Sequence, residues 1–507
     1  MAFSQLVVAL VTSWLTHRVY LIVYRLYFHR LAKFPGPRLA AISTLYRAFY
    51  QIWKDGKLIE HATELHDLYG PVIRISPNEL HFRSVAAYHD IYSAKFQGTK
   101  DPDYYEHLGQ STALFGLVDP IQHGARFRLV AHLFSKRHFD SLTARINAHI
   151  SRFSQLLSLS AQNQEICNLS FGFRSVALDI VNDFIFGDLP HKFRQLKNET
   201  FLEPLAVGTY DAMNWWIWLS RNYPTLLSLI QKMPSSWLQS MTHAFEAPKI
   251  VVELVTSMVD DALTVRPKDW HERFFYCIVH GLEGQNRNGS ESASVPSSVL
   301  VEEVMGTMLG GVIDIANILP YGAFQLSQSP QLQDRLYEEL RGAWTNITDP
   351  IPDYETLCTL PLLNGLVKES VRLTHGVISG PPRAVGPLGA VIDGYSVPPK
   401  SVVTTTSLYL HMDADVFPQP ETFDPLRWVT GNPKQMENAI VAFSKGRRMC
   451  PAKHLAYMEM FSIFAMLFRR FQVSSYETDI HDFDYSEYLS LHFRGKPLRV
   501  KLRERPS

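Results

Sequence analysis

One cysteine near the C-terminus, Cys450, constrains this chain more than any other residue. It ends a short loop that reads F-S-K-G-R-R-M-C over residues 443–450, and a segment with helical periodicity follows at 455–461. Neighbouring cations and a helix N-terminus both lower the pKa of a thiol, and the thiolate is the form that reacts and binds metals. Gly446 allows the backbone a tight turn toward a flat, closely approaching partner. The three cations of the loop would meet anionic groups on that partner.

The ligand set of this loop is wrong for zinc but suits haem. Structural zinc takes about four protein ligands, whereas the loop offers a single cysteine, which fits haem-thiolate ligation. The loop resembles the haem-binding signature of the cytochrome P450 superfamily, F-x-x-G-x-R-x-C-x-G, and departs from it only at Ala452, which replaces the last glycine. The matching residues are Phe443, Gly446, Arg448 and Cys450.

The resemblance implies a cofactor and its contacts. Cys450 would be the axial ligand of the iron of haem b (iron protoporphyrin IX), Arg448 would contact a haem propionate, and Phe443 and Gly446 would belong to the cofactor-binding loop. The alternative is a buried free cysteine beside a basic loop.

Composition excludes some classes of function. The chain has 507 residues, 46% of them hydrophobic, so it can bury a large core. Its 49 basic and 49 acidic residues cancel, which leaves no electrostatic argument for nucleic-acid binding. The four cysteines are scattered without a pairing pattern, as expected in a reducing compartment. They are Cys167, Cys277, Cys358 and Cys450.

The N-terminal segment predicts a membrane anchor. Residues 2–24 are mostly apolar, interrupted by His17 and Arg18, and a spanning helix needs about 20 residues. The segment lacks the basic start and small-residue cleavage site of a secretory signal. Basic residues at 25–33 place the rest of the chain in the cytosol by the positive-inside rule. A helix that lies in the membrane interface is the alternative.

A proline-rich bend, F-P-G-P-R at residues 34–38, follows the anchor. It resembles the hinge of microsomal P450s, and the longer run 24–41 is similar to filamentous-fungal members. We therefore expect a membrane anchor at residues 1–33 and one haem domain at 34–507. The resemblance implies the endoplasmic reticulum membrane, with a cytosolic catalytic domain.

The periodicity elsewhere predicts a mainly α-helical fold with small β-sheets, as the P450 fold is. Residues 70–82 alternate β-branched and polar residues around a turn, which predicts a hairpin. The polar run 284–298 predicts a connecting loop. The tryptophan-rich run 214–219 would roof the substrate pocket and dip into the membrane, as the resemblance implies, or pack in the core. Helical periodicity marks residues 136–160, 169–187 and 323–345.

Two further motifs match the resemblance in order and spacing. Glu369 and Arg372 lie on one face of a predicted helix, and F-D-P-L-R-W at 423–428 resembles the segment that supplies Arg427. By resemblance these three form a buried charge network that holds the scaffold of the haem loop. Arg383, which follows this helix in S-G-P-P-R-A, would reach a haem propionate.

Two departures from the family pattern stand out. His123 matches a haem-contacting position, but Phe127 stands where an arginine is expected. Arg126 and Arg128 flank Phe127 at about 100° around the helix, and they either substitute for that arginine or face a reductase.

The second departure is in the central helix, M-L-G-G-V-I-D-I-A-N at 308–317. The family's acid–alcohol pair supplies protons for cleavage of the O–O bond. Here Ile313 takes the acid position and Asp314 takes the alcohol position, so Asp314 is the candidate catalytic residue. The alternative is that Asp314 caps or pairs elsewhere, although a buried carboxylate without a partner is costly.

The resemblance implies a monooxygenase that hydroxylates or epoxidises a hydrophobic small molecule, plausibly a terpenoid or polyketide of fungal secondary metabolism. Dioxygen would be the co-substrate. The chain lacks a strand followed by G-x-G-x-x-G, so electrons would come from a separate NADPH–cytochrome P450 reductase. The altered central helix leaves two alternatives open: an oxygen-independent haem-thiolate isomerase or dehydratase, and a non-catalytic haem-binding relative.

Overall fold

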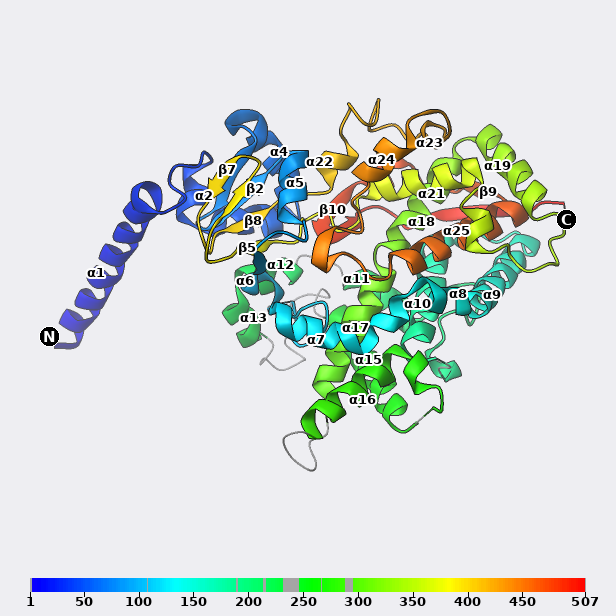
Figure 1. The fold of residues 1–507 in the computed structure, drawn as a ribbon, viewed down its shortest axis with the longest axis horizontal. Helices are drawn as coiled ribbons and strands as arrows, with labels where there is room; N and C mark the ends of the chain where they lie inside the picture. Colours follow the sequence, from blue (N-terminus) through cyan, green and yellow to red (C-terminus); the bar gives the residue numbers. More distant parts are fainter. Residues whose placement is uncertain are drawn as a thin grey trace.

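A long N-terminal helix projects from a helical body that carries a sheet-rich lobe on the same side (Figure 1). The predicted mainly α-helical architecture with small β-sheets is confirmed. The structure, a computed structural model, describes residues 2–106, 108–187, 190–212, 216–230, 246–265, 267–287 and 295–506.

The largest sheet joins segments from both ends of the chain. Its strand order is β1-β2-β8-β5-β3, and the predicted hairpin at 70–82 is confirmed, because β1 and β2 pair antiparallel. At the opposite edge β3 pairs antiparallel with β5, which sets Lys100 directly across from Arg383. The strands are β1 Val72–Ser76, β2 Glu79–Phe82, β3 Gly98–Lys100, β5 Arg383–Val385 and β8 Val402–Thr404.

The helical body surrounds one large hydrophobic cluster. Two predicted helices are each interrupted: 136–160 at Leu142, and 323–345 just before Pro330, since proline suits the first turn of a helix and not its interior. The helices of this body are α7 Pro120–Val130, α8 Lys136–Ser141, α9 Thr143–Gln162, α10 Leu169–Phe186, α15 Glu246–Leu263, α16 Phe274–Arg287, α17 Ser297–Val312, α18 Ile315–Ser327, α19 Pro330–Ala343, α20 Tyr354–Leu357, α21 Pro361–Thr374 and α25 Lys453–Arg470.

The predicted loop 284–298 is shorter than expected, because α16 continues to Arg287 and α17 begins at Ser297; residues 288–294 lie outside the described part. The remaining helices are α1 Ala2–Val23, α2 Arg38–Ile42, α3 Leu45–Ala48, α4 Leu58–Tyr69, α5 Val85–Ile91, α6 Pro102–Tyr105, α11 Pro204–Asp211, α12 Trp216–Asn222, α13 Pro224–Ile230, α22 Leu408–His411, α23 Arg427–Thr430 and α24 Pro433–Ala439. The remaining strands are β4 Cys167–Asn168, β6 Ala390–Ile392, β7 Tyr395–Val397, β9 Phe471–Ser475, β10 Tyr485–Tyr488, β11 Ser490–Phe493 and β12 Arg499–Glu504.

The N-terminal helix fits a membrane anchor. A helical stretch from Phe3 to Phe28 is long and apolar enough to cross a membrane, and none of its most apolar window is buried in the protein. The hinge that follows packs on the large sheet: Arg74 N–H donates to the Pro35 carbonyl over 2.7 Å. A side chain at Gly36 would come within 2.6 Å of the Arg74 carbonyl, so this bend requires glycine.

The tryptophan-rich run is divided by the fold. Trp218, on α12, is fully buried and donates its indole N–H to the Glu487 carbonyl over 2.6 Å. It packs with Tyr104. Of the two alternatives for this run, core packing therefore applies to Trp218, and immersion in the membrane does not. Trp215 lies outside the described residues.

Candidate functional site

The Cys450 loop is closed by its own backbone. Cys450 N–H donates to the Phe443 carbonyl over 2.9 Å, and the Phe443 ring packs against Tyr457 with 5.2 Å between ring centroids. Burial raises the pKa of the Cys450 thiol to about 11, although an N–H from Ala452 and the charge of Lys453 lower it. The expectation that the loop cations activate this thiol is therefore wrong for the protein alone. A bound metal ion would deprotonate it.

Gly446 permits a close approach, but to the chain itself. Its φ of +73° lies in the left-handed region, and a Cβ there would come within 2.3 Å of the Tyr92 carbonyl, just past α5. Glycine at this position therefore seats the loop against the sheet lobe.

Basic side chains from three parts of the chain converge beside the loop. Lys100 and Arg383 face each other across β3 and β5, and Arg448 and His123 interact electrostatically with this pair. Burial, followed by repulsion between like charges, lowers the pKa of His123 to about 3 and that of Arg448 to about 10. The same causes hold the pKa of Lys100 well below its usual value.

This basic cluster, which consists of Lys100, His123, Arg383 and Arg448, forms no ion pair with a carboxylate in the described part of the chain. The nearest acidic influence is that of Asp119, which raises the pKa of Arg448 but is outweighed by burial and by Arg383. Nη1 of Arg448 is buried without a hydrogen-bond partner, while its Nη2 donates to the Val118 carbonyl over 3.2 Å. Uncompensated buried charge is strongly destabilising. A ligand with two carboxylates, as the propionates of haem are, would supply the missing charge, so these residues fit haem.

The sequence did not single out Lys100. It stands 350 positions before Cys450, and only the pairing of β3 with β5 brings it to the site. Its ammonium group donates to the Phe115 carbonyl and lies 4.2 Å from the centre of the Tyr105 ring. The sequence offered only one indication of its role, namely a lysine at the end of a short segment, and the fold buries that lysine.

The two arginines of α7 do not join the basic cluster. Arg126 pairs with Glu303 of α17, and Arg128 is exposed. Glu303 also accepts the Leu114 N–H over 3.0 Å, and the neighbouring Glu302 accepts the Thr112 N–H over 2.8 Å. The arginine of α7 therefore helps to fasten residues 112–114 onto α17 and does not take the expected role at a propionate.

The central helix breaks where the sequence departs from the family pattern. Helix α17 ends at Val312 and α18 begins at Ile315. Ile313 N–H still donates to the Leu309 carbonyl over 3.0 Å, and the Asp314 carbonyl accepts the Ile318 N–H over 2.9 Å, so the interruption is short. Pro320 removes one donor in α18. Gly310, one turn before Asp314, faces open space, since no atom lies within 4 Å of where its Cβ would stand. Residues four apart share a helix face, so Asp314 is placed on the same open side.

Asp314 is electrostatically linked to the thiol. Its negative charge raises the pKa of Cys450, so the two groups lie near each other inside the protein. Burial raises the pKa of the Asp314 carboxyl, and a hydrogen bond with the Ser490 side chain lowers it in part. The first half of the alternative, in which Asp314 caps a helix, is not realised, because its side chain makes no capping hydrogen bond at the start of α18. The second half, in which Asp314 interacts elsewhere, stays open, since Ser490 affects its pKa.

The predicted charge network is formed as expected. Glu369 and Arg372 are fully buried and bonded over 2.7 and 3.0 Å. Arg427 Nε donates to the Glu369 carboxylate over 3.0 Å, and Trp428 Nε1 does so over 2.8 Å. Arg372 also donates to the His411 carbonyl over 2.9 Å. The network therefore ties α21 to the segment that leads to the Cys450 loop.

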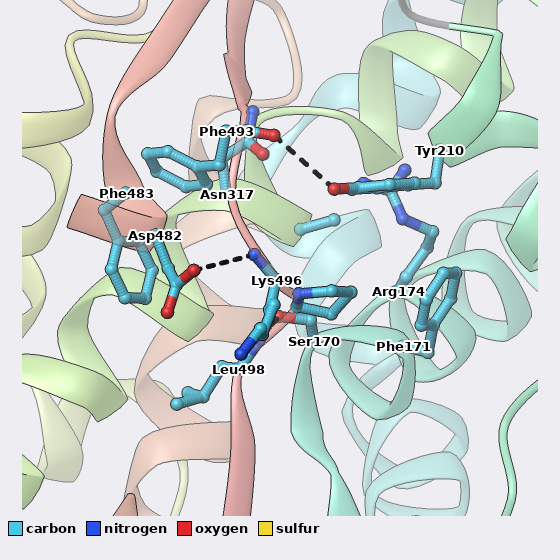
Figure 2. Close-up of a pocket in the computed structure, with 12 residues that line it drawn as sticks. Ser170, Phe171, Arg174, Tyr210, Asn317, Asp482, Phe483, Phe493, Lys496 and Leu498 are labelled. Atoms are coloured by element: carbon cyan, nitrogen blue, oxygen red, sulfur yellow. Dashed lines mark hydrogen bonds between the residues drawn. The ribbon is translucent and has the colours of Figure 1, made fainter. Parts of the chain in front are cut away.

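A small pocket with a mixed polar and apolar lining lies between α10, α11, α18 and the C-terminal strands (Figure 2). The Arg174 guanidinium lies 5.3 Å from the centre of the Tyr210 ring, and its Nη1 is buried without a partner. Tyr210 donates to the Phe493 carbonyl over 3.5 Å. Asn317 lines this pocket and donates to the Leu491 carbonyl over 2.8 Å, which joins α18 to β11.

The fold and the site define a haem-thiolate protein: one half-buried cysteine on a closed loop, a basic cluster beside it, and an interrupted central helix whose Asp314 acts on the cysteine. The cytochrome P450 family model matches residues 40–502. The chain therefore belongs to the cytochrome P450 family, as its motifs indicate, and the expectations of haem iron and of an oxidoreductase of the monooxygenase class are confirmed.

Known proteins agree with this assignment. Cytochrome P450 monooxygenase ppzG of Metarhizium majus is 38% identical over 54% of this chain and 94% of its own. Tryptophan 6-hydroxylase fscE of Fusarium equiseti is 30% identical over 93% of this chain and 90% of its own. The solved structure of retinoic acid bound cyanobacterial CYP120A1 covers 93% of this chain and 99% of its own with a TM-score of 0.69 at 17% identity, which shows the fold.

Proposed function

We propose that this protein is a membrane-anchored monooxygenase that hydroxylates or epoxidises a hydrophobic small molecule of fungal secondary metabolism. The observation that carries the proposal is the basic cluster, which forms no ion pair in the described part of the chain and leaves Nη1 of Arg448 without a partner, beside the Cys450 loop. A terpenoid or polyketide intermediate remains the proposed substrate class. The relative named tryptophan 6-hydroxylase adds aromatic amino acids to the compounds worth testing.

The proposed cofactor is haem b, held by Cys450 as the axial ligand. Arg448, Arg383, His123 and Lys100 would neutralise its propionates. Phe443 and Gly446 would hold the loop in shape, the first by packing on α25 and the second by seating the loop on Tyr92. When bound, the haem-thiolate centre supplies the activation of dioxygen, because the thiolate favours cleavage of the O–O bond.

Asp314 is the proposed proton donor of the chain. Burial raises the pKa of its carboxyl, which favours the protonated form that a general acid requires. Its placement at the helix break, on the open side with Gly310 and near Cys450, supports this role.

The proposed electron donor is a separate NADPH–cytochrome P450 reductase. The proposed location is the endoplasmic reticulum membrane, with residues 1–33 as the anchor and residues 34–507 as the cytosolic haem domain. The apolar helix from Phe3 to Phe28 supports the anchor.

The altered central helix favours one second candidate, an oxygen-independent haem-thiolate isomerase or dehydratase. A non-catalytic haem-binding relative is less favoured, because the Cys450 loop is fully formed. The full chain, loaded with haem and mixed with reductase, should convert a panel of terpenes, polyketides and tryptophan only when NADPH and dioxygen are both present. Conversion in their absence would replace the monooxygenase assignment with the isomerase or dehydratase.

Asp314→Ala should retain haem, lower the product formed per NADPH and raise hydrogen peroxide, because protons reach dioxygen more slowly. Asp314→Thr should restore part of the coupling. An unchanged ratio of product to NADPH in Asp314→Ala would remove Asp314 from the proton path while leaving the monooxygenase assignment intact.

A further inference from the structure

Arg174 of α10 is a buried arginine whose guanidinium has no partner in the described part of the chain. Only 4% of the residue is exposed, and a guanidinium carries five N–H donors. These donors form neither a hydrogen bond nor an ion pair with any described residue, and Nη1 is closed off from solvent. A buried charged group with unsatisfied donors is costly, so this side chain favours a bound ligand that accepts hydrogen bonds.

Other buried arginines of this protein do have partners. Arg469 of α25 is fully buried, and its guanidinium donates to the Trp344 carbonyl over 3.0 Å and to the Thr345 carbonyl over 3.1 Å. Arg372 pairs with Glu369. The lack of partners at Arg174 is therefore a local property of its surroundings.

Two carboxylates near Arg174 do not pair with it. Asp482 lines the same pocket, but its two oxygens accept the backbone N–H groups of Asp479 over 3.0 Å and of Lys496 over 2.9 Å. The charge of Asp211 raises the pKa of Arg174, whereas burial outweighs it and lowers that pKa to about 10. Arg174 therefore stays positively charged at neutral pH.

The guanidinium borders the small pocket between α10, α11 and α18. Figure 2 shows Arg174 and Tyr210 on one side of this pocket and Asp482 on the other. The Tyr210 ring, 5.3 Å from the guanidinium, holds the arginine at the wall. The exposed Lys496 adds a second positive charge to the lining. The pocket volume is about 20 Å³, and one water molecule needs about 10–15 Å³, so the pocket suits an occupant of that size.

We propose that this pocket binds one small inorganic anion of the size of chloride, with Arg174 as its main hydrogen-bond donor. The anion would accept N–H groups of the guanidinium and balance its buried charge. A water molecule has the right size but no charge, and a phosphate or a bulky carboxylic acid is too large. Asn317 also lines the pocket and bonds the Leu491 carbonyl over 2.8 Å. The anion would therefore fasten α10 to α18, and this role does not depend on the proposed function.

Diffraction from crystals of the full-length holoenzyme grown in sodium bromide tests the site directly, because bromide replaces chloride and scatters anomalously. An anomalous peak should lie within hydrogen-bond distance of the Arg174 guanidinium, and it should be lost in Arg174→Met. The wild-type map decides the question even if Arg174→Met does not fold. Bromide at other places only, with a water molecule beside Arg174, would overturn the inference.

Urea unfolding of the holoenzyme tests the same site in solution, in sodium chloride and in sodium gluconate of equal ionic strength. Gluconate is too large for the pocket. A ligand that binds only the folded state stabilises it, so chloride should raise the urea midpoint of wild type. Arg174→Met should lose this dependence, and in gluconate it should be at least as stable as wild type, since a buried unpaired charge is gone.

The matched control is Arg494→Met, which removes the same charge from the same C-terminal segment. Arg494 is exposed, pairs with Asp55 over 3.1 Å and does not line the pocket. This variant should keep the chloride dependence of wild type. Equal midpoints of wild type in the two salts would contradict the proposal, as would an Arg174→Met protein that keeps the full chloride effect. Loss of the effect in both variants would assign it to the general charge of this region and overturn the site.

Discussion

At the scale of single residues, the site is defined by charges that the protein leaves unbalanced. Lys100 and Arg448 are buried next to other basic groups, and the pKa of each is lowered mainly by that burial. Burying charge without a counter-charge costs several kcal/mol. A bound ligand of opposite charge would offset this cost and stabilise the cluster. The basic cluster therefore favours a ligand with two negative charges, and haem is such a ligand because it carries two propionates.

Lys100→Met should therefore affect the folding stability of the protein and its retention of haem in different ways. Removing a buried unpaired charge should leave the haem-free protein at least as stable as wild type. Haem should leave the variant roughly tenfold to hundredfold faster, since a hydrogen bond to a charged group contributes about 1.5–3 kcal/mol.

Transfer of haem to apomyoglobin measures that rate, and chemical unfolding of the haem-free protein measures the stability. Lys95→Met is the matched control, because Lys95 is an exposed lysine just before β3. Equal rates of haem loss in the Lys100 and Lys95 variants would exclude Lys100 from the cofactor site.

Local sequence pattern predicted the residues that form the loop, and it missed those that tertiary structure delivers. Cys450 and Arg448 lie within one short motif, so their spacing was informative. Lys100 reaches the site through strand pairing, and it has no neighbour in sequence that shares its role. Cations near the cysteine were expected to lower the pKa of the thiol, whereas burial raises it and outweighs the effect of Lys453.

At the scale of elements, the network around Glu369 fixes the helix that supports the haem loop. Glu369 and Arg372 of α21 are both fully buried, and Arg427 joins them from the start of α23. Five hydrogen bonds reach the Glu369 carboxylate: two from Arg372, and one each from Arg427, Trp428 and the Asp424 N–H. Removing the carboxylate would leave two arginines without a counter-charge.

Glu369→Ala should cost about 3–5 kcal/mol of folding free energy, the usual effect of stranding a buried charge. The purified variant should be mostly free of haem and should unfold at lower denaturant concentration. Glu437→Ala is the control, because Glu437 pairs with Lys368 of the same helix at the surface, and such pairs contribute about 0–1 kcal/mol. A stable, haem-loaded Glu369→Ala protein would show that the network does not support the fold.

Helix existence was readable from periodicity, but the places where helices break were not. The central helix has the pattern of one apolar run, and its interruption at Ile313 and Asp314 has no proline or other helix-breaking residue at that place to predict it. The tryptophan-rich run was also hard to interpret from local sequence. Trp218 is buried, and its indole N–H bonds Glu487, which lies 269 positions away.

At the scale of the whole molecule, the anchor leaves the body beside a set of exposed apolar residues. These lie on short helices of the N-terminal lobe and on α13, and Figure 1 shows α2 and α13 on the side from which α1 projects. Exposed apolar groups next to an anchor favour contact with the membrane. We call them the apolar rim: Leu39, Leu45, Phe49, Trp53, Leu226 and Leu229.

Deleting residues 2–23 should move most of the protein into the soluble fraction. This deletion removes α1 and keeps Leu31, which is fully buried against the large sheet. The remaining membrane binding should come from the apolar rim, so Trp53→Ser with Leu229→Ser should abolish it. Flotation with liposomes of neutral lipid measures both effects.

Ile480→Ser is the control for the apolar rim, because Ile480 is a similarly exposed residue in the turn that packs on α18. It should leave liposome binding unchanged. Full-length protein that stays soluble without detergent would contradict the anchor, and truncated protein whose binding survives the double substitution would contradict the rim.

The central claim is that Cys450 binds the haem iron as a thiolate, and the ferrous carbon monoxide spectrum tests it most directly. Wild type should show the absorption band characteristic of thiolate-ligated haem, and Cys450→Ala should lose it while the protein remains folded. Cys167→Ala, which removes a buried thiol elsewhere in the protein, should keep the band. A Cys450→Ala protein that retains the thiolate band would contradict the account.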